Sequence, residues 1–329
     1  SGIDEVINKW TKPLLEVFHT EPKIEIQEKT LERNNKFSYA VTMQPHEGCE
    51  AKSKAGYAFR LSKPRIVIPV FPGSGSENDV RRAFEAGGGN CTLVNVRNLN
   101  GHLIARSFRE LAAAIKTAQI VFIPGGFSGG DEPDGPAKFI SAVLTNAYVR
   151  EAIEELLSCR DGLLAGIGNG FQGLINTGLL PFGEYREKTE ESPTLTKNDV
   201  GEHVSRMINT RIISTKSPWM SRFKVGDVYT MPVSHSYGKF YCTDSELLSY
   251  IRNGQIAAQY TDKYGNSGMD IEINPNGSIG GIEALTSPDG KILGKMAHSE
   301  RMFGENLYKN MPKSENQNIF KAGIDYFKG

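Results

Sequence analysis

The sequence predicts an α/β protein with a mostly parallel central sheet, helices on both faces and a β-rich elaboration toward the C-terminus. Three observations lead to this fold class. Apolar runs of strand length alternate with segments of helical spacing from Arg65 to Ile175, glycine-rich loops follow several of these runs, and strand signals dominate from about Arg211. Such alternation is typical of a parallel sheet with both faces buried. Ligands bind these sheets at the carboxyl ends of the strands.

The strands and helices are expected in a regular order. Strands of the parallel part are predicted at Arg65–Val70, Thr92–Val96, Gln119–Ile123 and Leu163–Ile167, and helices at Glu77–Ala86, Phe108–Lys116, Ala137–Leu144 and Val149–Leu157, with a further helix carrying Phe171, Leu174 and Ile175. The β-rich part is predicted to have strands at Arg211–Ser214, Val228–Val233, Ile256–Tyr260, Met269–Ile273, Ile279–Leu285 and Ile292–Lys295, and a final helix at Asn318–Phe327.

Composition excludes several classes of function. The 329 residues carry 38 basic and 38 acidic side chains and are 39% hydrophobic. No long basic block and no apolar run of about 20 residues occurs, so we expect neither nucleic acid nor a membrane as partner. The four cysteines lack Cys-x-x-Cys spacing, which argues against a zinc site or a disulfide framework. They suit a reducing cytoplasm, where we expect the protein to be found.

Residues 1–62 differ from the domain predicted at 63–329. A helix broken at Pro13 is expected over Ile3–Phe18, and a charged segment with almost no aromatic residues follows at Glu21–Lys36. We interpret residues 1–62 as a linker or as an extension that lies along the protein surface.

The stretch Gly166-Ile-Gly-Asn-Gly170 lies between a buried strand and a helix. This is the outline of a nucleophile elbow, in which a sharp turn lifts a Ser or Cys above the sheet. Here the nucleophile position, Gly168, has no side chain. A plain tight turn or a phosphate loop is the alternative, because glycines between a strand and a helix are common in both.

A possible catalytic pair follows the last predicted strand. In an extended segment residues i and i+2 point the same way, so Glu300 is placed to orient His298. A surface ion pair is the alternative for an isolated His-x-Glu. His235, just after another strand, is either a structural or a ligand-lining histidine.

Two further features lie close to the predicted elbow. The backbone N–H groups of Pro124-Gly-Gly-Phe-Ser128, together with the N–H of Asn169, are candidates for an oxyanion site, unless this is an ordinary loop. Gln172 lies one helical turn beyond the elbow, where it faces either the pocket or solvent.

Together these motifs resemble class I glutamine amidotransferases, and most closely the glutaminase domain of phosphoribosylformylglycinamidine synthase. The matching stretches are Phe71-Pro-Gly73, Pro124-Gly-Gly-Phe-Ser-Gly-Gly-Asp-Glu-Pro-Asp134, Gly166-Ile-Gly-Asn-Gly-Phe-Gln172, Gly178-Leu-Leu-Pro181, His203-Val-Ser-Arg206, Ser217-Pro-Trp219, Pro232-Val-Ser-His235 and Gly294-Lys-Met-Ala-His-Ser-Glu-Arg301. The resemblance runs from about residue 63 to the end and implies a flavodoxin-like fold.

The resemblance also implies a reaction. A cysteine at the elbow attacks the side-chain amide of glutamine, a γ-glutamyl thioester forms and is hydrolysed, and ammonia passes to a synthetase domain that aminates formylglycinamide ribonucleotide. It implies that His298 is the general base and acid, that Glu300 orients it, and that Gly126, Phe127 and Asn169 line the oxyanion pocket. By the same resemblance Gln172 contacts the substrate amide.

The resemblance places the other components of the reaction outside this domain. It implies no cofactor here, since ATP and Mg²⁺ belong to the synthetase part of the parent enzyme. The synthetase domain is expected on the same polypeptide, joined through residues 1–62.

The sequence departs from the family pattern at two points. The elbow cysteine is Gly168, and the first loop, usually Asn-Cys-Glu, contains Gly75-Ser-Glu77. The local context of Cys49, Cys91, Cys159 and Cys242 makes none of them a replacement. The chain is therefore either an engineered inactive form or a natural domain without glutaminase chemistry. In the second case it is a non-catalytic module that binds the synthetase or senses glutamine.

Overall fold

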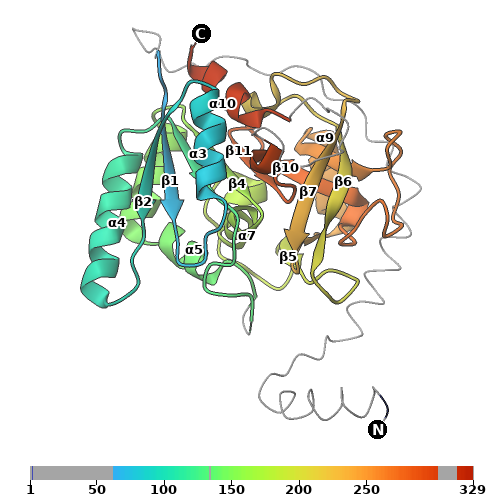
Figure 1. Ribbon diagram of the computed structural model, residues 1–329, viewed down its shortest axis with the longest axis horizontal. Coiled ribbons are helices and arrows are strands. Elements are labelled where there is room, and N and C mark those ends of the chain that lie inside the picture. Colours follow the sequence, from blue (N-terminus) through green and yellow to red (C-terminus); the bar gives the residue numbers. More distant parts are fainter. Residues whose placement is uncertain (1, 3–61, 133–134, 303–316, 329) are drawn as a thin grey trace.

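The computed structural model describes residues 2, 62–132, 135–302 and 317–328 (Figure 1). A nine-stranded sheet forms its centre, in the order β2-β1-β3-β4-β11-β10-β9-β6-β7. These strands are β1 (Arg65–Val70), β2 (Asn90–Asn95), β3 (Ile120–Ile123), β4 (Leu163–Ile167), β6 (Val204–Ile212), β7 (Val228–His235), β9 (Ile256–Thr261), β10 (Ile282–Thr286) and β11 (Ile292–Lys295). The strands from β2 to β11 pair in parallel, and the pairs from β11 to β7 are antiparallel. The α/β class is therefore confirmed.

Helices cover both faces of the parallel part, so two apolar cores form. The helices are α3 (Glu77–Ala86), α4 (Gly101–Ile115), α5 (Lys138–Leu144), α6 (Ala147–Ser158), α7 (Asn169–Asn176), α8 (Leu179–Phe182), α9 (Asp244–Arg252) and α10 (Ile319–Lys328). Side chains alternate across β1: Val67 packs in the core beneath α4 and α6, whereas Ile66 and Ile68 pack in the core beneath α3 and α10. The strands at the centre are buried on both faces, which explains their continuous apolar sequence.

The β-rich part differs from the sequence prediction in several places. The predicted strand Met269–Ile273 is wrong, because the backbone turns there and the Asp270 carbonyl accepts the N–H groups of Ile273 and Asn274. The strand predicted from Ile279 begins only at Ile282. The positive φ angles of Gly280 and Gly281, 60° and 66°, form a short turn before it.

Other elements of this part were not predicted. Helix α9 begins at a capping box between Thr243 and Glu246. Strand β6 begins at Val204, well before the predicted Arg211, and β5 (Thr194–Thr196) pairs with β8 (Lys239–Tyr241) in a separate small sheet. Of these additions only the longer β6 belongs to the central sheet, on the antiparallel side that begins at β11; the His-x-Glu motif follows β11.

The predicted helix over Ile3–Phe18 and the charged segment after it lie outside the described residues. Within the described ranges, no helix combines the length and apolar content needed to cross a bilayer.

Candidate active site

The turn from β4 into α7 has the geometry of a nucleophile elbow. Gly168 has φ 53° and ψ −112°. Positive φ favours glycine, and this ψ lies far from the value of about +47° that left-handed helical residues adopt. The N–H group of Gly168 donates to the carbonyl of Lys295 at 2.9 Å, which fixes the turn to the end of β11.

The pairing of β11 with β4 brings His298 beside this turn. Lys295 is in register with Ile167, so the segment after β11 passes directly over the elbow. The ring of His298 is buried, and its Nδ1 lies 2.6 Å from Oε1 of Glu300, which is also buried. The two predicted residues therefore form a buried pair and not a surface ion pair.

The charge state of Glu300 decides which ring nitrogen of His298 carries the proton. Burial on its own raises the pKa of Glu300, but the charge and hydrogen bond of His298 outweigh it, and the net pKa lies below its usual value. An ionised carboxylate only accepts hydrogen bonds, so Nδ1 of His298 donates to it. The opposite nitrogen, Nε2, is then the basic atom of the neutral ring, and it faces Gly168.

The position of the missing side chain is well defined. A Cβ atom built on Gly168 would lie 3.4 Å from Cε1 and 3.5 Å from Nε2 of His298, and 3.8 Å from Cα of Gly125. These are ordinary contact distances, so a side chain at this position has space and points at the basic nitrogen. A nucleophilic atom bonded to this Cβ would have to come within about 2.6–3.2 Å of Nε2 for proton transfer, and the Cβ lies close enough to allow this.

The Gly-Gly loop after β3 provides one backbone donor and not two. The N–H of Phe127 donates to the Gly73 carbonyl at 2.8 Å, so it is not available to an oxyanion. Gly126 forms an isolated antiparallel bridge with Ser74. In this pairing its own N–H points away from the 73–75 segment. Gly126 therefore remains an oxyanion candidate, while Phe127 lines the pocket with a half-exposed ring.

The second candidate for a backbone donor is the N–H of Asn169. It is the first N–H of α7, where a helix leaves its amide groups without partners in the helix. The side chain of Asn169 serves a different purpose, since its Oδ1 accepts the N–H and hydroxyl of Ser128 at 3.0 and 2.6 Å. The elbow and the Gly-Gly loop are thereby joined.

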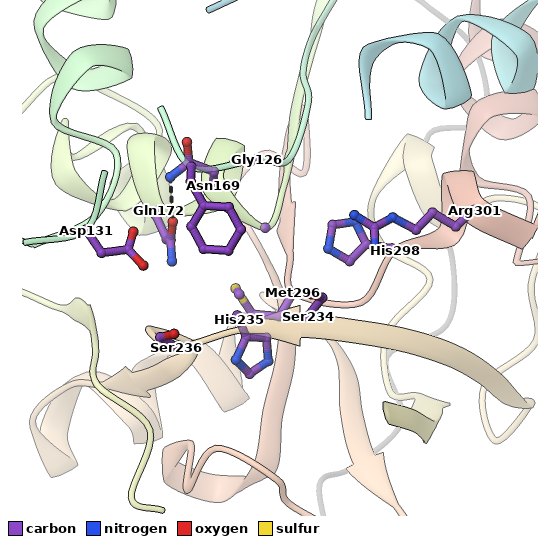
Figure 2. Close-up of a pocket in the computed structure, with 12 residues that line it drawn as sticks. Gly126, Asp131, Asn169, Gln172, Ser234, His235, Ser236, Met296, His298 and Arg301 are labelled. Atoms are coloured by element: carbon purple, nitrogen blue, oxygen red, sulfur yellow. Dashed lines mark hydrogen bonds between the residues drawn. The ribbon is translucent and has the colours of Figure 1, made fainter. Parts of the chain in front are cut away.

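Gln172 faces the pocket, but its amide is already engaged. Its Oε1 accepts from Nδ2 of Asn169 at 2.8 Å (Figure 2). Its Nε2 donates to the carbonyl of Tyr237 at 2.6 Å. The hydroxyl of Tyr237 in turn donates to Glu132 in the Gly-Gly loop. We call these hydrogen bonds the rim circuit. Gln172 therefore ties α7 to the turn after β7.

His235 is a buried, neutral residue of the pocket wall. Burial, followed by the neighbouring charges of His298 and His203, lowers the pKa of His235 to about 3. Nδ1 lies 3.2 Å from Oδ1 of Asn198, and Nε2 has no hydrogen-bond partner among the described residues. The ring packs against Gly238, where any Cβ would overlap it. His235 therefore both lines the pocket and packs as a structural residue, and its low pKa makes it a poor base.

These residues line one pocket that opens to solvent. Its lining includes all the predicted residues except Glu300, which lies behind His298. It also includes five that the sequence analysis missed: Asp131, Ser234, Ser236, Met296 and Arg301. Each of them is a close neighbour of a predicted residue in the chain, and this proximity was the available signal.

None of the three cysteines in the described residues lines this pocket. Burial and then the charge of Glu85 raise the pKa of Cys91 to about 12, so it is a thiol at neutral pH. Thiols react as thiolates, which makes Cys91 a poor nucleophile.

Fold and site together define a glutamine amidotransferase domain. A family model described as a CobB/CobQ-like glutamine amidotransferase domain matches residues 63–327, and the chain belongs to this family. Within it, the chain is a glutamine amidotransferase domain of the phosphoribosylformylglycinamidine synthase type.

The relatives that support this assignment are matched over most of their length. The chain is 32% identical to phosphoribosylformylglycinamidine synthase subunit PurQ of Aquifex aeolicus, over 72% of the chain and 90% of the relative. It is 27% identical to the PurQ subunit of Methanococcus maripaludis strain C5, over 80% of the chain and 98% of the relative. The PurLQS structure from Thermotoga maritima matches with a TM-score of 0.58 and 22% identity, covering 81% of this chain and all of that one, and supports the fold.

Proposed function

We propose that the chain binds glutamine as the ammonia-supplying domain of a phosphoribosylformylglycinamidine synthase, and that Gly168 leaves it without its own nucleophile. One observation carries this proposal: a side chain at position 168 would point at Nε2 of His298, whose Nδ1 is held by Glu300 at 2.6 Å. A triad without its first member therefore remains assembled.

The chemistry of the complete triad follows from these positions. A thiol on residue 168 transfers its proton to Nε2 of His298, and the thiolate attacks the side-chain carbonyl carbon of glutamine. The N–H groups of Gly126 and Asn169 stabilise the oxyanion. His298 then returns the proton to the leaving nitrogen, the C–N bond breaks and ammonia leaves. Water hydrolyses the γ-glutamyl thioester. With glycine at 168 the first step has no attacking atom.

The charges of the pocket orient the amino-acid end of glutamine. Asp131 and His298 lie at opposite ends of the lining in Figure 2. With its amide at Gly168, an extended glutamine directs its α-ammonium group toward Asp131. Burial, followed by the charge of Glu132, raises the pKa of Asp131, which means that the pocket disfavours the charged carboxylate. A cationic group bound beside Asp131 would stabilise that charge. Free glutamine is therefore preferred over a glutamine side chain within a peptide.

The synthetase is the partner that this function needs. The relatives carry the name of a synthase subunit, and one similar structure is a PurLQS assembly. We propose that this chain docks on a synthetase that consumes ammonia and ATP, either through residues 1–62 on one polypeptide or as a separate subunit. A non-catalytic glutamine-sensing module is the second candidate, and the glycine at 168 favours it.

Titration calorimetry with glutamine tests the proposal. Binding should be reversible and should release no ammonia, and Asp131→Asn should weaken it about tenfold, since one charge-assisted contact contributes about 1.5 kcal/mol or more. Glu184→Gln, an exposed change outside the pocket lining, is the matched control. Absence of binding at millimolar glutamine, with and without the synthetase, would contradict the proposal. Ammonia release would separate an active glutaminase from a sensor.

A further inference from the structure

Behind the pocket lies a buried ion pair that the reaction does not use. Lys295, the last residue of β11, is 2% exposed, and Glu283 on β10 is fully buried. Their charged atoms are 3.4 Å apart. Removing two charges from water is expensive, and an apolar pair of the same volume is often at least as stable. The pair therefore calls for a role other than stability.

The hydrogen bonds of this pair converge on the residues that flank His298. Nζ of Lys295 donates to the carbonyl of Ala297 at 3.0 Å and to Oγ of Ser299 at 2.8 Å. Oε1 of Glu283 accepts the N–H of Ala297 at 2.9 Å. Both backbone polar groups of Ala297 and the side chain of Ser299 are thus held from the side opposite the pocket.

Lys295 also contacts the nucleophile position. Its carbonyl accepts the N–H of Gly168 at 2.9 Å. The N–H of His298 donates to the carbonyl of Pro232 on β7, also at 2.9 Å, which fixes the loop to the antiparallel half of the sheet. One residue therefore holds the elbow through its backbone and the histidine loop through its side chain.

We propose that Lys295 and Glu283 are positioning residues that set the distance between His298 and the side chain at position 168. The inference rests on the proposed function, in which His298 is the base. Neither residue lines the pocket, so neither contacts the substrate. Their side chains act through the loop that carries His298, and the Lys295 carbonyl acts through the elbow. A misplacement of about 1 Å between reacting groups lowers a rate by about a hundredfold.

Two substitutions separate positioning from stability. Lys295→Met keeps the aliphatic length but leaves Glu283 as an unpaired buried charge, so its urea midpoint should fall. The double variant Lys295→Met/Glu283→Gln removes both charges and should regain most of that midpoint. The donor to Ala297 and Ser299 is still missing in the double variant, so the position of His298 should remain altered.

The position of His298 can be read without substrate. The short hydrogen bond between its Nδ1 and Glu300 should give a far-downfield NMR resonance in the unsubstituted chain, and we expect this resonance to shift or broaden in the double variant. In the background of Gly168→Cys, the double substitution Lys295→Met/Glu283→Gln should lower kcat for ammonia release about a hundredfold, while KM changes only a few-fold.

A third variant keeps the test decisive if the double variant fails to fold. Ser299→Ala removes one acceptor of Lys295, together with the hydrogen bond from the Ser299 hydroxyl to Gln317, but leaves both buried charges in place, and it should move the same resonance. Ser107→Ala is the matched control, because Ser107 is equally buried but its hydroxyl accepts from Arg97 in another part of the fold. A folded double variant, or Ser299→Ala, with an unchanged resonance would overturn the inference. Failure of glutamine binding would leave this NMR result standing and would refute only the proposed function.

Discussion

Replacing Gly168 with cysteine should restore ammonia release and lower the stability of the domain. The added Cβ meets His298 and Gly125 at 3.4–3.8 Å, so no atom has to move to admit it. Beside the start of α7 and a histidine, the new thiol should have a lowered pKa, which favours the reactive thiolate.

The loss of stability comes from the backbone. A residue with a Cβ held at φ 53° and ψ −112° stores about 1–3 kcal/mol of strain. Removing the freedom of glycine from the unfolded chain returns about 0.4–1 kcal/mol. We therefore expect a net loss of about 1–2 kcal/mol. With a urea dependence of about 3 kcal/mol per molar for a domain of this size, the midpoint should fall by about 0.5 M.

Two measurements on the same samples check this prediction: ammonia release from glutamine tests the restored activity, and urea unfolding tests the lowered stability. Gly168→Ala is the control, because it adds the Cβ and the strain without the thiol. Its midpoint should fall as far as that of Gly168→Cys, and it should release no ammonia. If Gly168→Cys releases no ammonia either alone or with the synthetase, the claim that the remaining triad residues are correctly placed is wrong. If Gly168→Cys is more stable than the glycine form, the claim that a side chain at position 168 strains the backbone is wrong.

Three other outcomes follow from the geometry of the pocket. Gly126→Ala should lower the free energy of unfolding by about 3 kcal/mol or more and abolish glutamine binding, because its Cβ would overlap the Gly73 carbonyl oxygen. The control is Gly130→Ala, whose Cβ meets nothing within 4 Å, so urea unfolding should show only the smaller loss from backbone strain and calorimetry should show unchanged glutamine binding. His235 has a folded pKa of about 3, below its usual 6.5, so protonation favours the unfolded chain. Stability should fall by about 1.4 kcal/mol per unit as pH drops from 6.5 toward 3, and His235→Gln should remove this component from unfolding curves measured across that range. Gln172→Leu should lower the free energy of unfolding by about 1–3 kcal/mol and weaken glutamine binding, because it leaves the side-chain amide of Asn169 and the carbonyl of Tyr237 without their hydrogen-bond partner. If neither urea unfolding nor calorimetry changes, the rim circuit does not contribute to stability or binding.

The parts of the site that are local in sequence could be predicted. The elbow at Gly168 follows from a short apolar run, glycines and a helix within a dozen residues. The pairing of His298 with Glu300 follows from their spacing. Both lie at the carboxyl ends of parallel strands, so their meeting was a consequence of the fold class.

The features that depend on distant pairing could not be predicted. The N–H of Phe127 is occupied only because the Gly-Gly loop bridges to Gly73, about fifty residues earlier. The segment around His235 reaches the pocket only because β6 and β7 pair with the sheet out of chain order, so the neighbours of His235, Ser234 and Ser236, could be suspected from the sequence but not placed. Helix α9 was different: its capping box at Thr243 was visible, but the surrounding strand signals masked it.

The strained turn at Gly168 has an evolutionary consequence. A cysteine codon becomes a glycine codon by one base change, and at this position that change relieves strain without removing any contact that holds the pocket together. Loss of the nucleophile is therefore both accessible by mutation and favourable to folding. A lineage that no longer needed hydrolysis would meet no stability barrier to this substitution. It would keep the hydrogen bonds from Ser128 to Asn169 that join the elbow to the Gly-Gly loop.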